Sequence, residues 1–203
     1  ALRARGWVES SAADAPPLPE TALAVPIAPL ALSVAQADAV ATVSAQLDQF
    51  QVFLLEGVAG SGKTEVYLRL IEAVLAQGRQ ALALTPEIGL TPQLLARFRE
   101  RLPGPLAVLH SGLSDRERLN AWLLARDGTA KAVVGTRSAV FAPLRAPGLL
   151  IVDEEHDLSY KQQDGFRYHA RDLAIMRGRQ LGIPVVLGSA TPALESIQNA
   201  RTG

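Results

Sequence analysis

A glycine-rich run, GVAGSGKT, occupies residues 57–64 and carries the clearest chemistry in the chain. It fits the spacing G-x-x-x-x-G-K-[ST], in which glycines let backbone N–H groups turn toward a polyanion without Cβ clashes. Lys63 is expected to neutralise charge on the β- and γ-phosphates, and the Thr64 hydroxyl to ligate Mg²⁺. The alternative is a plain glycine turn whose threonine caps a helix. The residues expected to bind ATP in this run are Gly57, Gly60, Ser61, Gly62, Lys63 and Thr64.

The second group is acidic. Residues 149–156, LLIVDEEH, form an apolar run that ends in three carboxylates and a histidine. At the carboxyl edge of a parallel sheet, Asp153 can hold the Mg²⁺ that Thr64 touches, and Glu154 can polarise the attacking water. The alternative is a solvated acidic turn. We expect catalytic roles for Lys63, Asp153 and Glu154, and metal ligation by Thr64 and Asp153.

Aromatic residues gather just after the acids. Tyr160, Phe166 and Tyr168 fall within nine residues, against ten aromatics in the whole chain, and the cations Lys161, Arg167 and Arg171 are interleaved with them. Aromatic and cationic side chains on a loop that contains glycine suit stacking on exposed bases and contact with phosphates. The alternative is that they pack under the next helix, which we expect for at least one of Phe166 and Tyr168.

These residues need a scaffold that brings them together, and the apolar pattern predicts one. Short continuous apolar runs alternate with helical patterns, which is typical of a parallel sheet buried on both faces. We therefore predict an α/β domain with a parallel sheet of six or seven strands flanked by helices. Strands are expected at 52–55, 81–84, 106–109, 132–134, 149–152 and 185–187, and helices at 34–49, 63–77, 92–101, 115–127 and 170–181.

Composition narrows the class of protein. The 203 residues contain 20 Lys and Arg against 20 Asp and Glu, which excludes a histone-like binder but not a local basic groove. Cysteine is absent, so this chain has no disulfide, no thiolate zinc site and no cysteine nucleophile.

Residues 1–31 are rich in Pro and Ala and predict an extended linker. The apolar run 22–32 imitates a secretory signal, but prolines interrupt it and it is too short to span a bilayer.

The order of the motifs resembles that of a known family. The phosphate-binding loop, the acids at 153–156 and a Ser-Ala-Thr turn at 189–191 resemble motifs I, II and III of superfamily 2 helicases of the DExH type. The segments TPEIGLTPQ (85–93), LHSGL (109–113), GTRSA (135–139), SYKQQ (159–163) and RYHARDL (167–173) are more specific. With them, residues 32–200 closely resemble the bacterial primosomal replication-restart helicases.

This resemblance implies a function for the domain. It implies a RecA-like P-loop NTPase fold, with residues 32–203 as the first helicase lobe and residues 1–9 comparable to the end of a winged-helix module. It implies an ATP- and Mg²⁺-dependent 3′-to-5′ DNA helicase of the bacterial cytoplasm, with no membrane association, that remodels stalled forks and starts primosome assembly. The expected partners are single-stranded and forked DNA, primosome proteins and single-strand-binding protein. The family's second lobe, its arginine finger and its cysteine-rich zinc module lie outside the match.

The resemblance also implies roles for individual residues. Gln36 resembles the adenine-reading glutamine, although an ordinary exposed helix residue is the alternative. Arg137 could reach a DNA phosphate or pair with a local acid. The residues implied in DNA binding, or in coupling it to hydrolysis, are Pro86, Glu87, Thr136, Arg137, Ser138, His156, Tyr160, Lys161, Phe166, Arg167, Tyr168, Ser189 and Thr191. Two alternatives remain: another P-loop enzyme, such as a small-molecule kinase, and a non-catalytic nucleotide-binding module.

Overall fold

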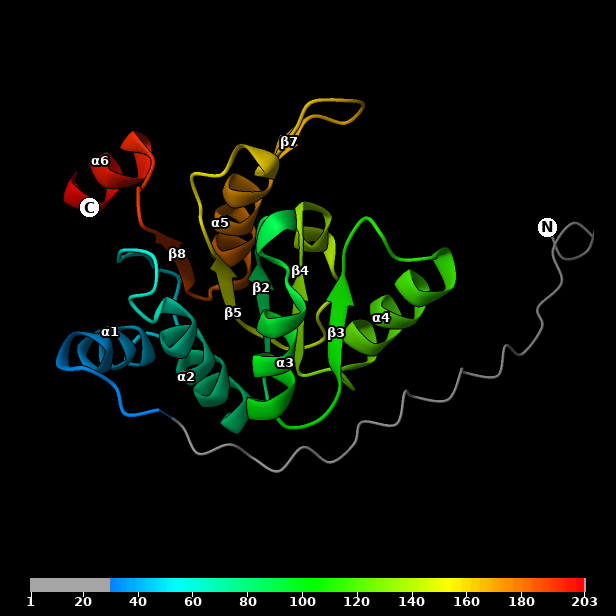
Figure 1. Ribbon diagram of the computed structural model, residues 1–203, viewed down its shortest axis with the longest axis horizontal. Coiled ribbons are helices and arrows are strands. Elements are labelled where there is room, and N and C mark those ends of the chain that lie inside the picture. The colour runs from blue at the N-terminus through cyan, green and yellow to red at the C-terminus, as the bar shows by residue number, and fades with distance from the viewer. Residues whose placement is uncertain (1–29, 203) are drawn as a thin grey trace, which may run out of the picture.

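The computed structural model describes residues 30–202. Its centre is a six-stranded sheet in which every neighbouring pair is parallel, with the strand order β1-β8-β5-β2-β4-β3 (Figure 1). The predicted parallel α/β sheet is therefore confirmed. The predicted linker lies outside the described residues apart from its last two positions, as does the comparison of residues 1–9 with a winged-helix module. The strands are β1 (Val52–Glu56), β2 (Gln80–Leu84), β3 (Leu106–Leu109), β4 (Ala132–Gly135), β5 (Pro147–Val152) and β8 (Val185–Ser189).

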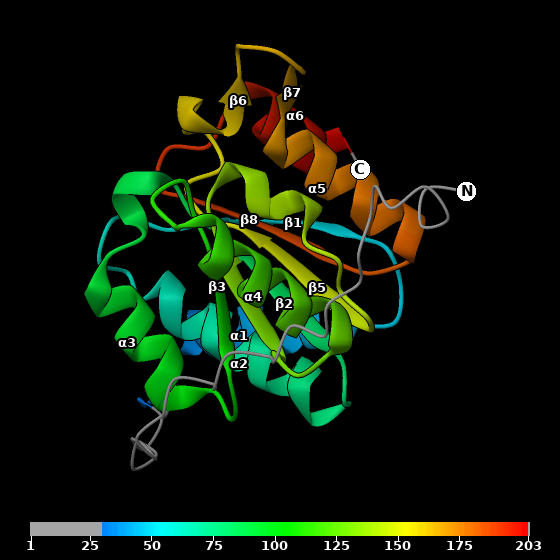
Figure 2. The same cartoon turned by 90° about the vertical axis from the view of Figure 1, so that its right-hand side faces the viewer.

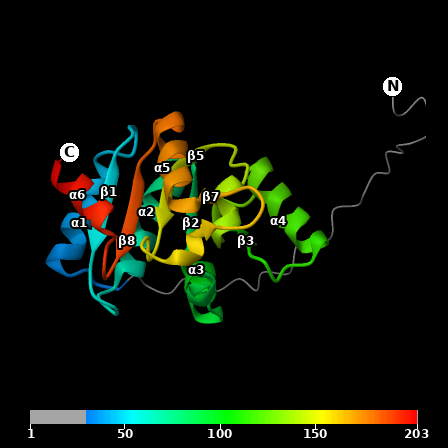
Figure 3. The same cartoon turned by 90° about the horizontal axis from the view of Figure 1, so that it is seen from above.

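Helices cover both faces of the sheet, and each face has its own apolar core. Figure 2 shows α1 and α2 below the strands and α5 above them, and Figure 3 shows the same layers from another side. One core includes Val43, Leu70 and Phe98 from the first three helices, and the other includes Ala125 and Ala174 from the next two. The helices are α1 (Val34–Ser44), α2 (Lys63–Ala76), α3 (Pro92–Arg101), α4 (Asp115–Asp127), α5 (Ala170–Leu181) and α6 (Leu194–Thr202).

Local sequence explains where most helices begin and end. Ser114 caps α4 in a capping box with Glu117, and Thr91 caps α3, whose first residue is Pro92. Gly128 and Gly182 end α4 and α5 in the left-handed conformation that glycine adopts readily. The predicted end of the first helix was wrong.

The first helix, predicted to reach residue 49, ends at Ser44, and the chain continues as turns. Leu47, within these turns, is buried in the core, and Arg79 donates a hydrogen bond of 3.1 Å to its carbonyl. Tertiary contacts at Leu47 thus override the local helical pattern, which extends to residue 49 in the sequence.

The segment between β5 and α5 has structure that the sequence patterns did not predict. A 3₁₀ turn, η4 (Leu158–Tyr160), leads into a small antiparallel hairpin of β6 (Lys161–Gln162) and β7 (Tyr168–His169), which projects from the domain in Figure 1. Gly165, at φ +66°, lies in its tip. Two further 3₁₀ turns are η2 (Glu87–Gly89) and η3 (Arg137–Phe141).

No helix within residues 30–202 has the length and apolarity needed to cross a bilayer.

Candidate active site

The predicted chemical groups meet at the carboxyl edge of the sheet. The phosphate-binding loop leaves β1, the acids leave β5, and the Ser-Ala-Thr turn leaves β8, which lies between these two strands. Backbone hydrogen bonds join the three exits: Gly57 N donates to the Ser189 carbonyl and Glu155 N donates to the Gly188 carbonyl, each at 3.0 Å. The phosphate-binding loop and the acids, about 100 residues apart in the chain, are thereby both fixed to the end of β8.

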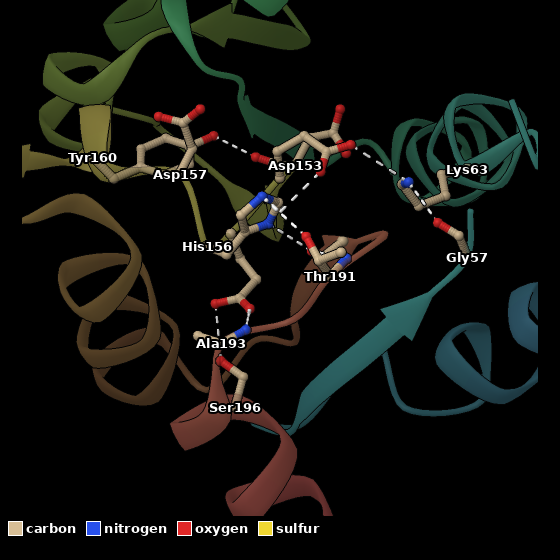
Figure 4. A network of polar contacts seen from close by, with 12 residues as sticks. Gly57, Lys63, Asp153, His156, Asp157, Tyr160, Thr191, Ala193 and Ser196 are labelled. Atoms are coloured by element: carbon tan, nitrogen blue, oxygen red, sulfur yellow. Dashed lines mark hydrogen bonds and ion pairs between the residues drawn. The ribbon is translucent and has the colours of Figure 1, made fainter. Parts of the chain in front are cut away.

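The phosphate-binding loop is held in shape by its own lysine. Lys63 Nζ donates to the Gly57 carbonyl at 2.9 Å and lies 3.5 Å from Oε1 of Glu154 (Figure 4). Gly62 begins α2 with φ +84°, and a Cβ there would collide with the Gln36 side chain. The dihedral angle therefore favours glycine, whereas the Gln36 amide, at the end of a flexible side chain, can move aside. The N-terminus of a 14-residue helix lies at this loop, which favours a bound anion.

The two acids differ in environment. Tyr67, one helical turn after Lys63, donates a hydrogen bond of 2.8 Å from its hydroxyl to Oδ1 of Asp153. Burial raises the pKa of Asp153, and the hydrogen bond from Tyr67 opposes that rise. Glu154 has φ 46° and is the one non-glycine residue of the described chain in the left-handed region. Such strain is often stored at functional sites.

A cavity of about 640 Å³ opens in front of these groups. This volume lies within the usual range for small-molecule and cofactor sites. Lys63, Thr64, Asp153 and Glu154 all line it, together with loop residues 58–62. No cluster of three His, Cys, Asp or Glu side chains that could hold a metal ion occurs within residues 30–202. Mg²⁺ in phosphate sites uses one or two carboxylates plus substrate oxygens, so Thr64 and Asp153 fit such an ion.

Gln36 lies against the phosphate-binding loop. Its Nε2 donates to the Ser61 carbonyl at 2.8 Å, and its Oε1 accepts from Ser33 N at 2.9 Å in the capping box of α1. The glutamine therefore joins the first helix to the loop. Its role in reading adenine stays a prediction.

The Ser-Ala-Thr turn contacts the acidic segment through one histidine. His156 Nδ1 lies 2.7 Å from the Ser189 hydroxyl, and its Nε2 lies 3.3 Å from the Thr191 hydroxyl. The same ring lies 3.8 Å from Oε2 of Glu154. Figure 4 shows His156 between Asp153 and Thr191. A change at the turn can therefore reach Glu154 through one side chain.

Further predicted residues lie on the segments that follow β2 and β4, which include the 3₁₀ turns η2 and η3. Glu87 accepts a hydrogen bond of 2.7 Å from the Ser111 hydroxyl, which ties the segment after Pro86 to the segment after β3. Thr136 is buried, whereas Ser138 is exposed. Arg137 donates to the backbone carbonyls of Ser159 and Lys161, at 3.1 and 3.2 Å. It thus anchors the start of the hairpin, in place of the local acid that sequence reasoning offered as its partner.

The expected aromatic platform needs a correction. Tyr160 is fully buried, and its hydroxyl donates at 2.6 Å to the backbone carbonyl of Asp153, so it cannot stack on a base. Phe141, at the end of η3, takes its place: its ring meets Tyr168 edge-on at 5.1 Å between centroids. The ring centroid of Phe166 lies 6.1 Å from that of Tyr168, and Phe166 is 78% exposed. The exposed cations nearby are Lys161 and Arg167.

Sequence reasoning also missed two residues near the acids. Tyr67 follows Lys63 by four positions and so lies on the same face of α2, a spacing that could have identified it. Glu155 is fully buried, although three consecutive acidic or basic residues usually indicate a solvated turn. Its burial depends on partners in α5 and around α6 that no local pattern reveals.

Curated relatives match this chain over about three quarters of its length. It is 56% identical over 154 residues to the replication restart protein PriA of Haemophilus influenzae, and 53% over 156 residues to that of Bacillus subtilis. The matched parts cover 76% and 77% of this chain, but 21% and 19% of those proteins. The chain therefore spans about a fifth of the length of these relatives.

Solved structures share the fold. A structure of RecG bound to a three-way DNA junction has a TM-score of 0.63 at 23% identity, covering 86% of this chain and 23% of that one. A hypothetical ATP-dependent RNA helicase from Sulfolobus tokodaii has a TM-score of 0.58 at 18% identity, covering 85% and 50%. A model of the DEAD/DEAH box helicases matches residues 33–200. That match takes in both the sheet and the cavity at its edge, and this chain belongs to the DEAD/DEAH box helicase family.

Proposed function

We propose that this chain is the ATP-binding lobe of an ATP-dependent 3′-to-5′ DNA helicase that remodels stalled forks and starts primosome assembly. The observation that carries the proposal is that Lys63, Thr64, Asp153 and Glu154, from two segments about 90 residues apart, line one cavity. The names of the relatives from Haemophilus influenzae and Bacillus subtilis support a role in replication restart.

Each group has a separate task in hydrolysis. Lys63 is positioned to place positive charge against the β- and γ-phosphates, where charge grows in the transition state. Thr64 and Asp153 would hold Mg²⁺, which when bound supplies further neutralisation of phosphate charge. Glu154 orients the attacking water and accepts its proton. In the structure Glu154 instead faces Lys63 at 3.5 Å, a pairing that keeps both side chains inside the cavity.

The hairpin supplies a surface for single-stranded DNA. Phe166 and the Phe141–Tyr168 pair present aromatic faces, and Lys161 and Arg167 are exposed beside them. Base stacking on aromatics with nearby cations is a common way to bind single strands without sequence preference. The start of the hairpin is joined to the ATP site, because the Tyr160 hydroxyl bonds to the carbonyl of Asp153. DNA on the hairpin and nucleotide in the cavity therefore share one segment of backbone.

The alternatives have less support. A small-molecule kinase would need an acceptor site next to the phosphates. The cavity that adjoins this site, of about 510 Å³, is lined in part by the TPEIGLTPQ segment, whose Pro86 the resemblance links to DNA binding or its coupling to hydrolysis. A non-catalytic module would not need Lys63, Thr64, Asp153 and Glu154 all in the same cavity. The resemblance extends the proposal to primosome proteins and single-strand-binding protein as partners, and to the bacterial cytoplasm as location. It places zinc in another part of the family's chain, not in these residues.

The test is DNA unwinding by the full-length protein. Forks with a single-stranded 3′ tail should be opened with ATP and Mg²⁺, and forks with only a 5′ tail should not. Lys63→Ala should abolish both unwinding and ATP hydrolysis while DNA binding persists, because Lys63 contacts no part of the hairpin. Lys131→Ala, which removes a lysine outside the cavity, is the matched control and should remain active. Turnover in Lys63→Ala close to that of the unaltered protein would contradict the site assignment.

A further inference from the structure

Glu155 follows β5 and contacts both the start of α5 and the segment after the Ser-Ala-Thr turn. It is fully buried, yet its two neighbours, Glu154 and His156, both face the site. Its Oε2 accepts from Arg171 at 3.0 Å and from the Ser196 hydroxyl at 2.9 Å, while Oε1 accepts from Ala193 N at 2.7 Å. Figure 4 shows Ala193 and Ser196 below the His156 cluster, on the far side from Lys63.

The partners of Glu155 lie at the starts of two helices, α5 and α6. Arg171 is in the first turn of α5, two residues after β7, and so fixes the end of the hairpin. Ala193 and Ser196 follow the Ser-Ala-Thr turn and fix the start of α6. One carboxylate thus connects the exit of the hairpin with the exit of the turn that contacts His156.

The ion pair between Glu155 and Arg171 is not explained by stability alone. A buried ion pair is weak evidence for stability, because the cost of desolvating two charges offsets their attraction. Arg171 also has a second carboxylate, since its Nε donates to Asp172 at 2.9 Å. Asp172 is 60% exposed, in contrast to the fully buried Glu155. The geometry therefore favours Glu155 as the contact that sets the position of Arg171.

We propose that Glu155 is a positioning residue that transmits DNA binding at the hairpin to the ATP site. When the hairpin binds a strand, Arg171 moves with its end, and Glu155 carries that shift to the backbone of Glu154 and, through the segment at Ala193, to the turn that contacts His156. The inference rests on the proposed function. It adds the residue by which DNA regulates hydrolysis, a residue that contacts neither DNA nor nucleotide.

The test compares basal and DNA-stimulated ATP hydrolysis of the full-length protein. In Glu155→Gln the amide oxygen can still accept from Ala193 N, but the amide nitrogen faces the Arg171 guanidinium as a second donor. Basal turnover should persist, while turnover at saturating single-stranded DNA should fall at least about fivefold, the lower end of usual coupling between sites. Binding of single-stranded DNA without nucleotide, followed by fluorescence anisotropy, should be retained.

Matched variants separate positioning from folding. Asp172→Asn removes the other carboxylate partner of Arg171 and should keep full stimulation. Arg171→Gln removes the same contact as Glu155→Gln from the opposite side, and the double variant leaves no buried charge unpaired. If the pair acts as a unit, the double variant should lose no more stimulation than either single variant. It also carries the test if Glu155→Gln alone unfolds at the assay temperature.

The outcomes are distinct. A folded Glu155→Gln or double variant with full stimulation overturns the inference, and so does a parallel loss of basal and stimulated turnover, which would make Glu155 a fold residue only. An unaltered protein that hydrolyses ATP without any response to DNA contradicts the proposed function, and the inference fails with it. Selective loss of stimulation, together with full stimulation in Asp172→Asn, supports the inference.

Discussion

The Tyr67 hydroxyl donates a hydrogen bond of 2.8 Å to Oδ1 of Asp153, the carboxylate expected to hold Mg²⁺. The tyrosine is buried in the second helix, and burial raises its own pKa, so it remains a donor at every pH of interest. A Cβ at Gly188 would collide with this hydroxyl, so the neighbouring strand leaves space for the contact. The bond orients one oxygen of Asp153, a residue that lines the cavity.

The pH dependence of stability should reveal this bond. Burial already raises the pKa of Asp153, so the folded chain binds more protons than the unfolded chain between the two pKa values, and stability falls as pH rises through that interval. Tyr67→Phe removes the hydrogen bond that opposes the rise and extends the interval upward. The stability deficit of the variant should grow with pH only across the upper part of the interval that the substitution adds, and level off above it at about 1.5 kcal/mol, the lower end for bonds to charged groups.

The measurement is urea unfolding of this chain at several pH values in buffer without Mg²⁺. Tyr160→Phe is the matched control, because its hydroxyl donates to the carbonyl of Asp153 and not to the carboxylate. Its deficit should not vary with pH in this interval. A deficit in Tyr67→Phe that is equally independent of pH would show that the phenol does not stabilise the ionised carboxylate.

Glu154→Gln should separate binding from chemistry. The amide keeps the size of the side chain but cannot accept a proton from water. We expect the full-length variant to bind nucleotide and Mg²⁺ and to hydrolyse ATP about 10²- to 10⁴-fold more slowly. Stopped-flow binding of a fluorescent nucleotide and steady-state phosphate release measure the two properties. Loss of nucleotide binding would assign Glu154 a structural role, which its left-handed φ of 46° makes a clear alternative.

The revised aromatic surface predicts a difference between exposed and buried rings. Replacing Phe141 and Phe166 by alanine together should reduce DNA stimulation of hydrolysis more than basal hydrolysis, because stacking contributes roughly 1–3 kcal/mol per base. Tyr160→Phe should preserve the ring under the hairpin and leave DNA affinity intact. The readouts are DNA affinity and the DNA concentration for half-maximal stimulation. Full stimulation in a folded Phe141/Phe166 double variant would favour simple packing of these rings.

Local patterns predicted the elements well and the long-range contacts poorly. All six strands of the main sheet were predicted within two residues of their ends, since runs such as 81–84 and 149–152 are continuously apolar. Their order in the sheet was not predicted. The hairpin at 161–169 was missed because each of its strands has two residues, and α6 was missed because its sequence carries mixed polar residues.

The site shows the same division. The residues from 57 to 64 and from 153 to 154 form motifs with a fixed spacing, so their grouping could be predicted. The burial of Tyr160 could not, because it depends on the position of the Asp153 carbonyl beneath the hairpin. The contacts of Arg137 with carbonyls 159 and 161 depend in the same way on the fold of another segment. Charge and aromaticity identified which residues gather, and tertiary packing determined which of them face solvent.

By itself, this chain of 203 residues should fold and bind ATP weakly, but hydrolyse it far more slowly than the full-length protein. The sheet, the phosphate-binding loop and the ligands for Mg²⁺ are all present, yet the cavity is bounded by one lobe, so much of a nucleotide would stay solvated. Arg101, which lines the cavity, is already paired with Glu65 and Glu72. An arginine contributed across the cleft by a second lobe, as the resemblance implies, is worth about 10³–10⁵ in rate.

The measurement is phosphate release by this chain with saturating ATP, Mg²⁺ and single-stranded DNA, beside the full-length protein under the same conditions. Binding of a fluorescent nucleotide to the chain, and its loss in Lys63→Ala, would show that the site is formed. Turnover by the chain that equals that of the full-length protein would mean that every catalytic group lies within these residues. The cationic group would then have to be sought on the cavity wall itself, where Arg97 lies exposed on α3.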